Sequence, residues 1–221
     1  MERFKKSKYT FILMAFFAIS ICILIYTIAF NEENLPVYNP TDFDPELVDA
    51  SIRNTASNHT VADFELINQN GKTITQKDYM NKIYVTDFFF TRCPSICPIM
   101  SNNMEKLQEQ FLNDNDVLFL SLSVTPKLDS VPILRDYADK HGVIDGKWNI
   151  TTGDKKHIYN LARKSYFAAV DEGDGGLQDF IHTPNFILVD QKKRIRGVYD
   201  GTKDEEIERI VQDIALLQRE G

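Results

Sequence analysis

One uncharged apolar run sets the overall plan of this chain. Between Tyr9 and Phe30 there is no charged residue, no glycine and no proline. A membrane-spanning helix needs roughly 20 apolar residues, and this run is long enough. Residues 1–8 include four cationic residues and one acidic residue, whereas Glu32 and Glu33 follow the run. This charge bias predicts a single-pass anchor over residues 9–30, with residues 1–8 in the cytoplasm and the rest on the extracytoplasmic or periplasmic side of the inner membrane.

Two other interpretations of this run are weaker. A cleaved signal peptide would have a shorter apolar stretch and a small-residue cleavage site, but the run ends in Ala29-Phe30-Asn31. A lipoprotein would use Cys22, yet the residue before it is Ile21, where a small residue is expected. We therefore favour a retained anchor with Cys22 as an apolar filler. Three prolines punctuate residues 31–55, which we interpret as a linker to a domain over residues 56–221.

Composition limits the classes of protein to consider. The 221 residues are 43% hydrophobic and 26% charged, which is typical of a globular chain. The net charge of −7 argues against nucleic acid as the main partner, because phosphate binding needs a basic face. Three cysteines are too few for a disulfide-stapled scaffold.

Hydrophobic patterning predicts an α/β domain. Two segments, 83–90 and 117–124, are apolar with little alternation, as in strands buried on both faces. Helices and shorter strands alternate with them. The expected strands are 62–68, 72–74, 83–90, 117–124, 148–150, 185–190 and 194–199, and the expected helices are 98–112, 130–141, 155–165 and 204–219. This order predicts a central mixed sheet with helices on both faces.

Two cysteines follow directly after the strand at 83–90. Cys93 and Cys97 lie in Thr91-Arg92-Cys93-Pro94-Ser95-Ile96-Cys97-Pro98, and Pro98 suits the first turn of a helix. The positive end of that helix is expected to favour thiolates at both positions. Three residues separate the cysteines, which is one more than the usual redox spacing. The wider separation suits a metal ion held between the two sulfurs and still permits a disulfide. A purely stabilising disulfide is the weaker interpretation, because closing so short a loop gains little.

His182 is the best candidate for a third ligand. It lies just before the strand at 185–190, which can bring it to the edge of the sheet where the cysteines lie. His59, His141 and His157 suit solvated or capping roles instead. Two thiolates and an imidazole favour a soft ion, and copper as Cu(I) or Cu(II) fits better than zinc, which usually takes four protein ligands in structural sites.

The segment Phe89–Pro98, together with Trp148, Thr152-Gly153 and His182-Thr183, resembles the Sco/SenC family of membrane-anchored copper proteins. The resemblance covers about residues 60–218. It implies a thioredoxin-like fold and a copper ion bound by Cys93, Cys97 and His182. It also implies a role in assembling the dinuclear copper centre of cytochrome c oxidase, by delivering copper or by keeping the thiols of that centre reduced.

Two positions depart from the family pattern. An Asp-Pro-x-x-Asp stretch is frequent in the family, but here Thr125 stands in place of the first acid and Asp129 is the second. Pro184 follows the His-Thr pair, near the point where thioredoxin-type enzymes have a cis-proline.

Two functions follow from these features. The first is a copper chaperone, not an enzyme in the usual sense, whose partners are the copper-bearing oxidase subunit or other copper donors and acceptors. The alternative is a thiol–disulfide oxidoreductase in which Cys93 and Cys97 form the redox-active pair and act on exported or oxidase-subunit cysteines. Only the first function requires His182. A copper or redox sensor is a third, weaker possibility.

Overall fold

The computed structural model describes residues 13–24, 34–168, 181 and 183–220. The chain forms two units, Met1–Asn34 and Leu35–Gly221. In the first unit residues 13–24 are helical, and the predicted anchor extends beyond the described residues on both sides. Among the described residues, no helix has the length and apolar character needed to cross a membrane.

The second unit is built on one sheet of seven strands in the order β2-β1-β5-β4-β3-β6-β7. Strands β3, β4 and β5 are parallel, and the remaining neighbours are antiparallel. This arrangement confirms the predicted central mixed sheet. The strands are β1 (Glu65–Asn68), β2 (Thr73–Thr75), β3 (Ile83–Phe89), β4 (Val117–Ser123), β5 (Trp148–Thr152), β6 (Asn185–Val189) and β7 (Ile195–Asp200).

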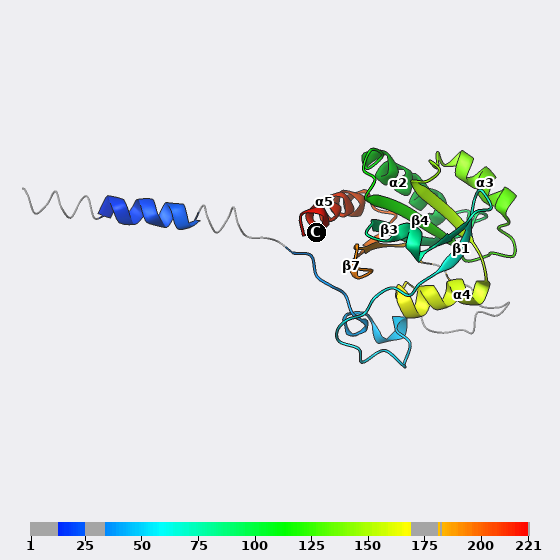
Figure 1. Ribbon diagram of the computed structural model, residues 1–221, viewed down its shortest axis with the longest axis horizontal. Helices are drawn as coiled ribbons and strands as arrows, with labels where there is room; N and C mark the ends of the chain where they lie inside the picture. The colour runs from blue at the N-terminus through cyan, green and yellow to red at the C-terminus, as the bar shows by residue number, and fades with distance from the viewer. Residues whose placement is uncertain (1–12, 25–33, 169–180, 182, 221) are drawn as a thin grey trace, which may run out of the picture. The chain divides into compact units, whose positions relative to one another are not determined.

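Helices cover both faces of this sheet, as the sequence predicts (Figure 1). Apolar side chains of α2, α3 and α5 pack in one core cluster, and those of α4 pack in the other. The helices are α2 (Ile96–Gln110), α3 (Val131–Lys140), α4 (Lys155–Asn160), which continues as a π-helical turn η4 (Leu161–Ser165), and α5 (Asp204–Glu220); short 3-10 turns are η1 (Pro40–Asp42), η2 (Pro45–Leu47) and η3 (Gln76–Tyr79).

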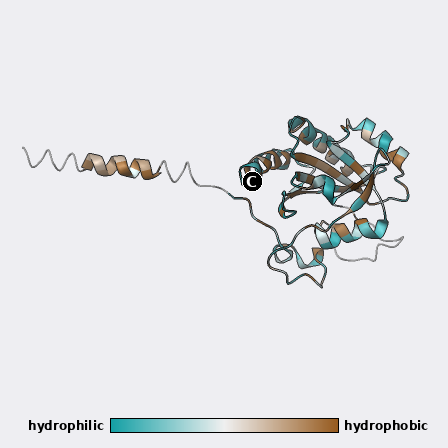
Figure 2. Ribbon diagram, in the orientation of Figure 1, coloured by the Kyte–Doolittle hydropathy of each residue, from teal (hydrophilic) through white to brown (hydrophobic). Residues whose placement is uncertain are grey.

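Strand β3 lies in the interior of the sheet, between β4 and β6, and its sequence is apolar on both faces. All seven of its residues are buried, and it pairs in parallel with β4 and antiparallel with β6. The hydropathy colouring shows the same arrangement, with apolar strands inside and polar residues on the outer sides of the helices (Figure 2). A polar residue in this strand is therefore removed from water on either side.

The segment after residue 34 packs against the sheet. Tyr38 forms an isolated antiparallel bridge with Ile195 at the outer edge of β7, and Val48 is fully buried. The guanidinium of Arg196 donates to the carbonyls of Leu35 and Pro36. In the structure, the compact unit therefore begins at Leu35, within the segment that the sequence predicts as a linker.

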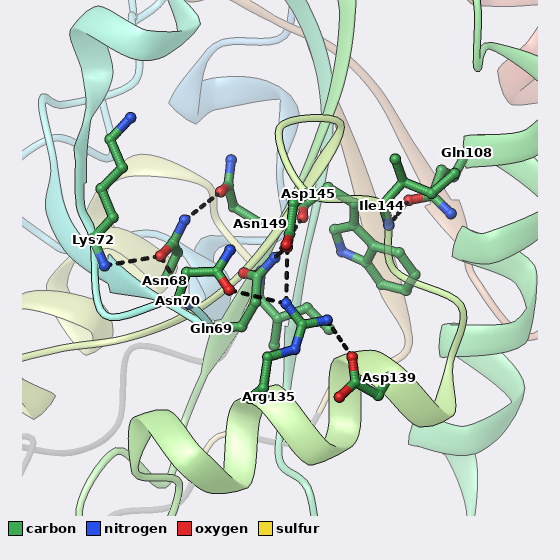
Figure 3. Close-up of polar contacts among 12 residues, drawn as sticks. Asn68, Gln69, Asn70, Lys72, Gln108, Arg135, Asp139, Ile144, Asp145 and Asn149 are labelled. Carbon is green, nitrogen blue, oxygen red and sulfur yellow. Dashed lines mark hydrogen bonds and ion pairs between the residues drawn. The ribbon is translucent and has the colours of Figure 1, made fainter.

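A polar network fixes the β1–β2 turn to the amino-terminal ends of the central parallel strands (Figure 3). Gln69 Nε2 donates to Asp145 Oδ1 over 2.8 Å and to the Trp148 carbonyl over 3.2 Å. Arg135 of α3 donates to Asp145 and to Asn70 of the turn. This network lies at the end of β4 and β5 opposite to the end that leads to the cysteines.

Candidate metal centre

The two cysteines lie where β3 gives way to α2. Cys93 is in the connecting loop, and Cys97 is the second residue of the helix, which begins at Ile96 after the N-cap Ser95. Pro98 falls in the first turn, as the sequence predicts, because a proline there loses no helical hydrogen bond. Strands β3 and β4 are parallel and pair from Ile83 with Val117 to Phe89 with Ser123, so both end at this edge.

The helix start brings the two sulfur-bearing residues together. The Cys97 backbone N–H donates to Cys93 Sγ over 3.5 Å, and Ser95 Oγ lies 3.7 Å from the same sulfur. Both cysteines are present as thiols and are buried, with exposed fractions of 6% and 2%. They belong to the same apolar cluster as Phe89 and Met100. Met100 is thus a core residue.

Burial changes the expected protonation of the pair. It raises the pKa of the Cys97 thiol to about 12, with Cys93 and Asp87 adding to the effect and the Phe90 backbone opposing it. The expectation that the helix terminus favours a thiolate at Cys97 is therefore wrong for this protein without metal. The reason is that removing the sulfur from water disfavours its charged form. A bound metal ion reverses this preference, because a coordinating thiol is deprotonated.

A buried carboxyl group lies beneath the cysteine edge. Asp87 of β3 is 3% exposed, and it accepts a hydrogen bond of 2.5 Å from Ser121 Oγ, which in turn accepts one from the indole N–H of Trp148. Burial raises the pKa of Asp87 to about 7, and the Ser121 hydrogen bond lowers it only in part. Asp87 is not among the site residues predicted from the sequence, although an aspartate inside an apolar strand is a visible signal.

Tyr137 of α3 also approaches the site. Its ring packs on Phe89 with 5.2 Å between centroids, and its hydroxyl lies 2.6 Å from Ser101 Oγ. Burial raises the pKa of Tyr137, and the charges of Asp87 and the cysteines raise it further. The phenol is therefore a neutral hydrogen-bonding group at neutral pH. Its contact with the site depends on the packing of α3, which no local pattern reveals.

His182 lies outside the described residues. Among the residues that are described, no three histidine, cysteine or acidic side chains converge on a common point that could hold a metal ion. Thr183 is buried, its hydroxyl accepts from the Asn185 N–H over 3.2 Å, and β6 begins at Asn185. No cis peptide occurs in the described part of the chain, so the Thr183–Pro184 bond is trans.

The three remaining histidines have contacts of their own. His59 Nε2 lies 2.8 Å from the Ser165 carbonyl, and the His141 ring packs on Tyr137. His141 is buried, so it is not solvated, but it is the C-cap residue of α3, in agreement with the capping role expected for it. The His157 N–H donates to the helix-capping Asp154 over 2.8 Å, as a residue of the first helical turn does.

The turn that departs from the family pattern forms a compact hydrogen-bonded group. Thr125 Oγ1 donates to Asp129 Oδ2 over 2.9 Å, and the Asp129 backbone N–H donates to the Thr125 carbonyl over 3.0 Å. A threonine at this position thus provides a hydrogen-bond donor to the second acid. A carboxylate there would instead bring a second negative charge toward Asp129.

These features define a class of protein: an α/β domain with a central mixed sheet and a buried cysteine pair at the start of the helix that follows the buried strand β3. A family model for SCO1/SenC matches residues 52–218. The chain belongs to the SCO1/SenC family, and its fold is thioredoxin-like.

Solved structures agree with this assignment. A SCO1/SenC family lipoprotein from Bacillus anthracis str. Ames is 32% identical, with a TM-score of 0.65 over 75% of this chain and 98% of that one. BsSco, described as a Sco-family cytochrome c oxidase assembly protein with a disulfide switch, is 30% identical, with a TM-score of 0.62 over 72% and 94%. ScoI of Bradyrhizobium japonicum with copper bound has the same fold, at 22% identity and a TM-score of 0.57 over 72% and 99%.

Proposed function

We propose that this protein is a membrane-anchored copper chaperone that binds one copper ion through Cys93, Cys97 and His182. In this role it supports assembly of the dinuclear copper centre of cytochrome c oxidase. The observation that carries the proposal is the pair of adjacent buried thiols at the start of α2, at the edge of the sheet where sites of α/β proteins usually form. Two sulfur ligands suit copper, and membership of the SCO1/SenC family supports the same ion.

The strand register supports the choice of His182. Strand β6 runs antiparallel to β3, with Tyr84 opposite Val189 and Thr86 opposite Ile187. The chain therefore enters β6 at the edge where β3 ends and the cysteine loop begins. His182 precedes the first residue of β6 by three positions. A short segment entering at this edge is well suited to supply a third ligand.

The donor set agrees with a copper ion as cargo. When bound, copper would provide the charge that deprotonates both thiols. The apolar cluster around Cys93 and Cys97 excludes water, and Ser95 is a hydrogen-bonding neighbour of Cys93. Because the folded protein holds the Cys97 thiol protonated, metal loading releases protons.

Copper loading of the reduced full chain tests the proposal. We expect one copper per chain, with sulfur-to-copper charge transfer and nitrogen coupling in the spectra of the copper(II) form. Cys93→Ala and Cys97→Ala should abolish the charge-transfer band, and His182→Ala should remove the nitrogen coupling. His157→Ala is the matched histidine control and should bind like the unmodified chain. Absence of copper in the reduced protein, or unchanged nitrogen coupling in His182→Ala, would contradict the proposal.

Thiol–disulfide exchange is the second candidate function. The short approach of the Cys97 N–H to Cys93 Sγ favours it, because the two residues are already adjacent in the reduced state. Oxidase assembly in cells separates the two functions. If His182→Ala supports assembly as well as the unmodified chain does, the redox function is favoured over metal transfer.

Anchoring over residues 9–30 is part of the proposal. The family is membrane-associated, and the B. anthracis relative is a lipoprotein. We expect the full chain to remain in the membrane pellet after an alkaline carbonate wash, and Cys22→Ser to remain there too. Release of the Cys22→Ser variant would instead indicate a lipid anchor on that cysteine.

A further inference from the structure

Asp129 carries a fully buried carboxylate that is held by hydroxyl and amide donors. It accepts from Ser123 Oγ over 2.5 Å and from Thr125 Oγ1 over 2.9 Å. It also accepts from Thr91 Oγ1 over 2.6 Å and, at 3.4 Å, from the Thr91 backbone N–H. We call these four residues, Thr91, Ser123, Thr125 and Asp129, the Asp129 cluster.

This carboxylate has an unusual environment for a buried acid. None of the ion pairs found in the described part of the chain includes Asp129, so its hydrogen bonds replace the water lost on burial. Hydrogen bonds to an ionised acceptor are stronger than neutral ones, and removing one partner of a buried group leaves the other unsatisfied. The geometry of the four donors around Asp129 is therefore closely constrained.

Three of the four donors lie at the ends of β3 and β4. The hydroxyl and the backbone N–H of Thr91 belong to the cysteine loop that follows β3, and the hydroxyl of Ser123 lies at the end of β4. Thr91 is two residues before Cys93, and Ser123 is the last residue of β4. The Cys93 N–H donates to the Phe90 carbonyl over 3.2 Å, so Thr91 lies inside the turn that delivers the cysteine. Asp129 thus connects the start of the cysteine loop to the rigid end of β4.

We propose that Asp129 is a positioning residue for the cysteine pair: through Thr91, its buried carboxylate fixes the loop that carries Cys93 opposite Cys97. The inference rests on the proposed function of that pair in copper binding. Thr91 and Asp129 act on the position of Cys93 through the backbone that joins Thr91 to Cys93. A loop held in this way keeps the two thiols at a high effective concentration relative to each other, which favours any reaction that joins them.

Thiol–disulfide equilibrium with glutathione measures this effective concentration without copper. The two protein thiols and one oxidised glutathione give the Cys93–Cys97 disulfide and two reduced glutathione molecules. Thr91→Val removes the hydroxyl donor with little change of shape, Thr91→Ser retains it, and Asp129→Asn removes the charge and part of the acceptor capacity. Thr151→Val is the matched control, because it removes a buried hydroxyl that donates to the Ser121 carbonyl away from the loop.

We expect the equilibrium constant for disulfide formation to fall at least threefold in Thr91→Val and Asp129→Asn. Thr91→Ser and Thr151→Val should stay within twofold of the unmodified full chain. Emission from Trp148, the single tryptophan, checks that each variant is folded. If Asp129→Asn does not fold, Thr91→Val decides, since it removes one hydroxyl only.

Three results would overturn the inference: a constant for Thr91→Val within twofold of the unmodified chain, an equal change in Thr151→Val, or an equal change in Thr91→Ser. Copper loading of the same variants separates this inference from the proposed function. If the unmodified chain binds no copper, the chaperone role is refuted and the glutathione result remains valid. If the unmodified chain binds copper and Thr91→Val gives unchanged values in both the copper and the glutathione assays, only the positioning role is refuted.

Discussion

Replacing Asp87 by asparagine should stabilise the protein, and the gain should increase with pH. Asp87 is buried in β3, and the hydrogen bond from Ser121 is its main compensation. Asparagine has nearly the same shape and keeps an oxygen that can accept the same hydrogen bond. The substitution therefore removes the ionisable group and little else.

The magnitude follows from the pKa of Asp87. In the folded protein it is raised from 3.8 to about 7, chiefly by burial. Between these values the folded state binds a proton that the unfolded chain has lost, so stability falls as pH rises through this window. At about 1.4 kcal/mol per pKa unit, the ionised carboxylate costs about 4 kcal/mol above pH 7, which is an upper bound for the gain in Asp87→Asn.

Urea unfolding of the full chain in a mild non-ionic detergent, followed by Trp148 emission, measures the difference. Trp148 is buried and its indole N–H donates to Ser121, so its emission reports on this region directly. We expect the unmodified chain and Asp87→Asn to have similar free energies of unfolding near pH 4. Near pH 8 the variant should be more stable by several kcal/mol.

Asp190→Asn is the matched control with the opposite sign. Asp190 is also buried, but Arg194 and Arg196 are 2.7 and 3.0 Å away, and its pKa is lowered because their hydrogen bonds outweigh burial. The stability from this acid is present above its unfolded pKa and is lost as pH falls through the lower folded pKa. Asp190→Asn should therefore destabilise at pH 8. A gain in Asp87→Asn that is absent, or constant from pH 4 to 8, would refute the reasoning.

Three further substitutions test the packing of the domain. Arg196→Met leaves Asp190 and Glu220 without their buried cation and should cost about 3 kcal/mol in urea unfolding; a cost below 1 kcal/mol would contradict this. Burial lowers the pKa of His141 in the folded protein, so the unfolded chain binds a proton more readily and the free energy of unfolding declines as pH falls below 6.5. His141→Gln should reduce this decline between pH 7 and 5, and an unchanged decline would exclude the histidine as its source. Gly142 has φ of +61°, so Gly142→Ala should lower stability by about 1 kcal/mol, and a thermal midpoint equal to that of the unmodified chain would contradict the strain.

Much of the fold was predictable because its signals are local. The strand at 83–90 has a continuous apolar sequence, and in the structure it is β3, an interior and fully buried strand. The position of Pro98 predicted a helix start beside Cys97, and α2 begins at Ile96. Each of these signals depends only on neighbouring residues and on the geometry of a strand or helix.

The sequence by itself therefore determined the order of the elements, the mixed α/β class and the place of the cysteine pair. It also identified Cys93, Cys97 and His182 as the candidate ligands, of which His182 stays a prediction. Tertiary structure decided what surrounds the pair. The raised pKa of Cys97 and of Asp87, and the cluster that joins Asp129 to Thr91, all arise from burial and from contacts between distant segments. Desolvation depends on every element packed around a group, and no local pattern in the chain contains that information.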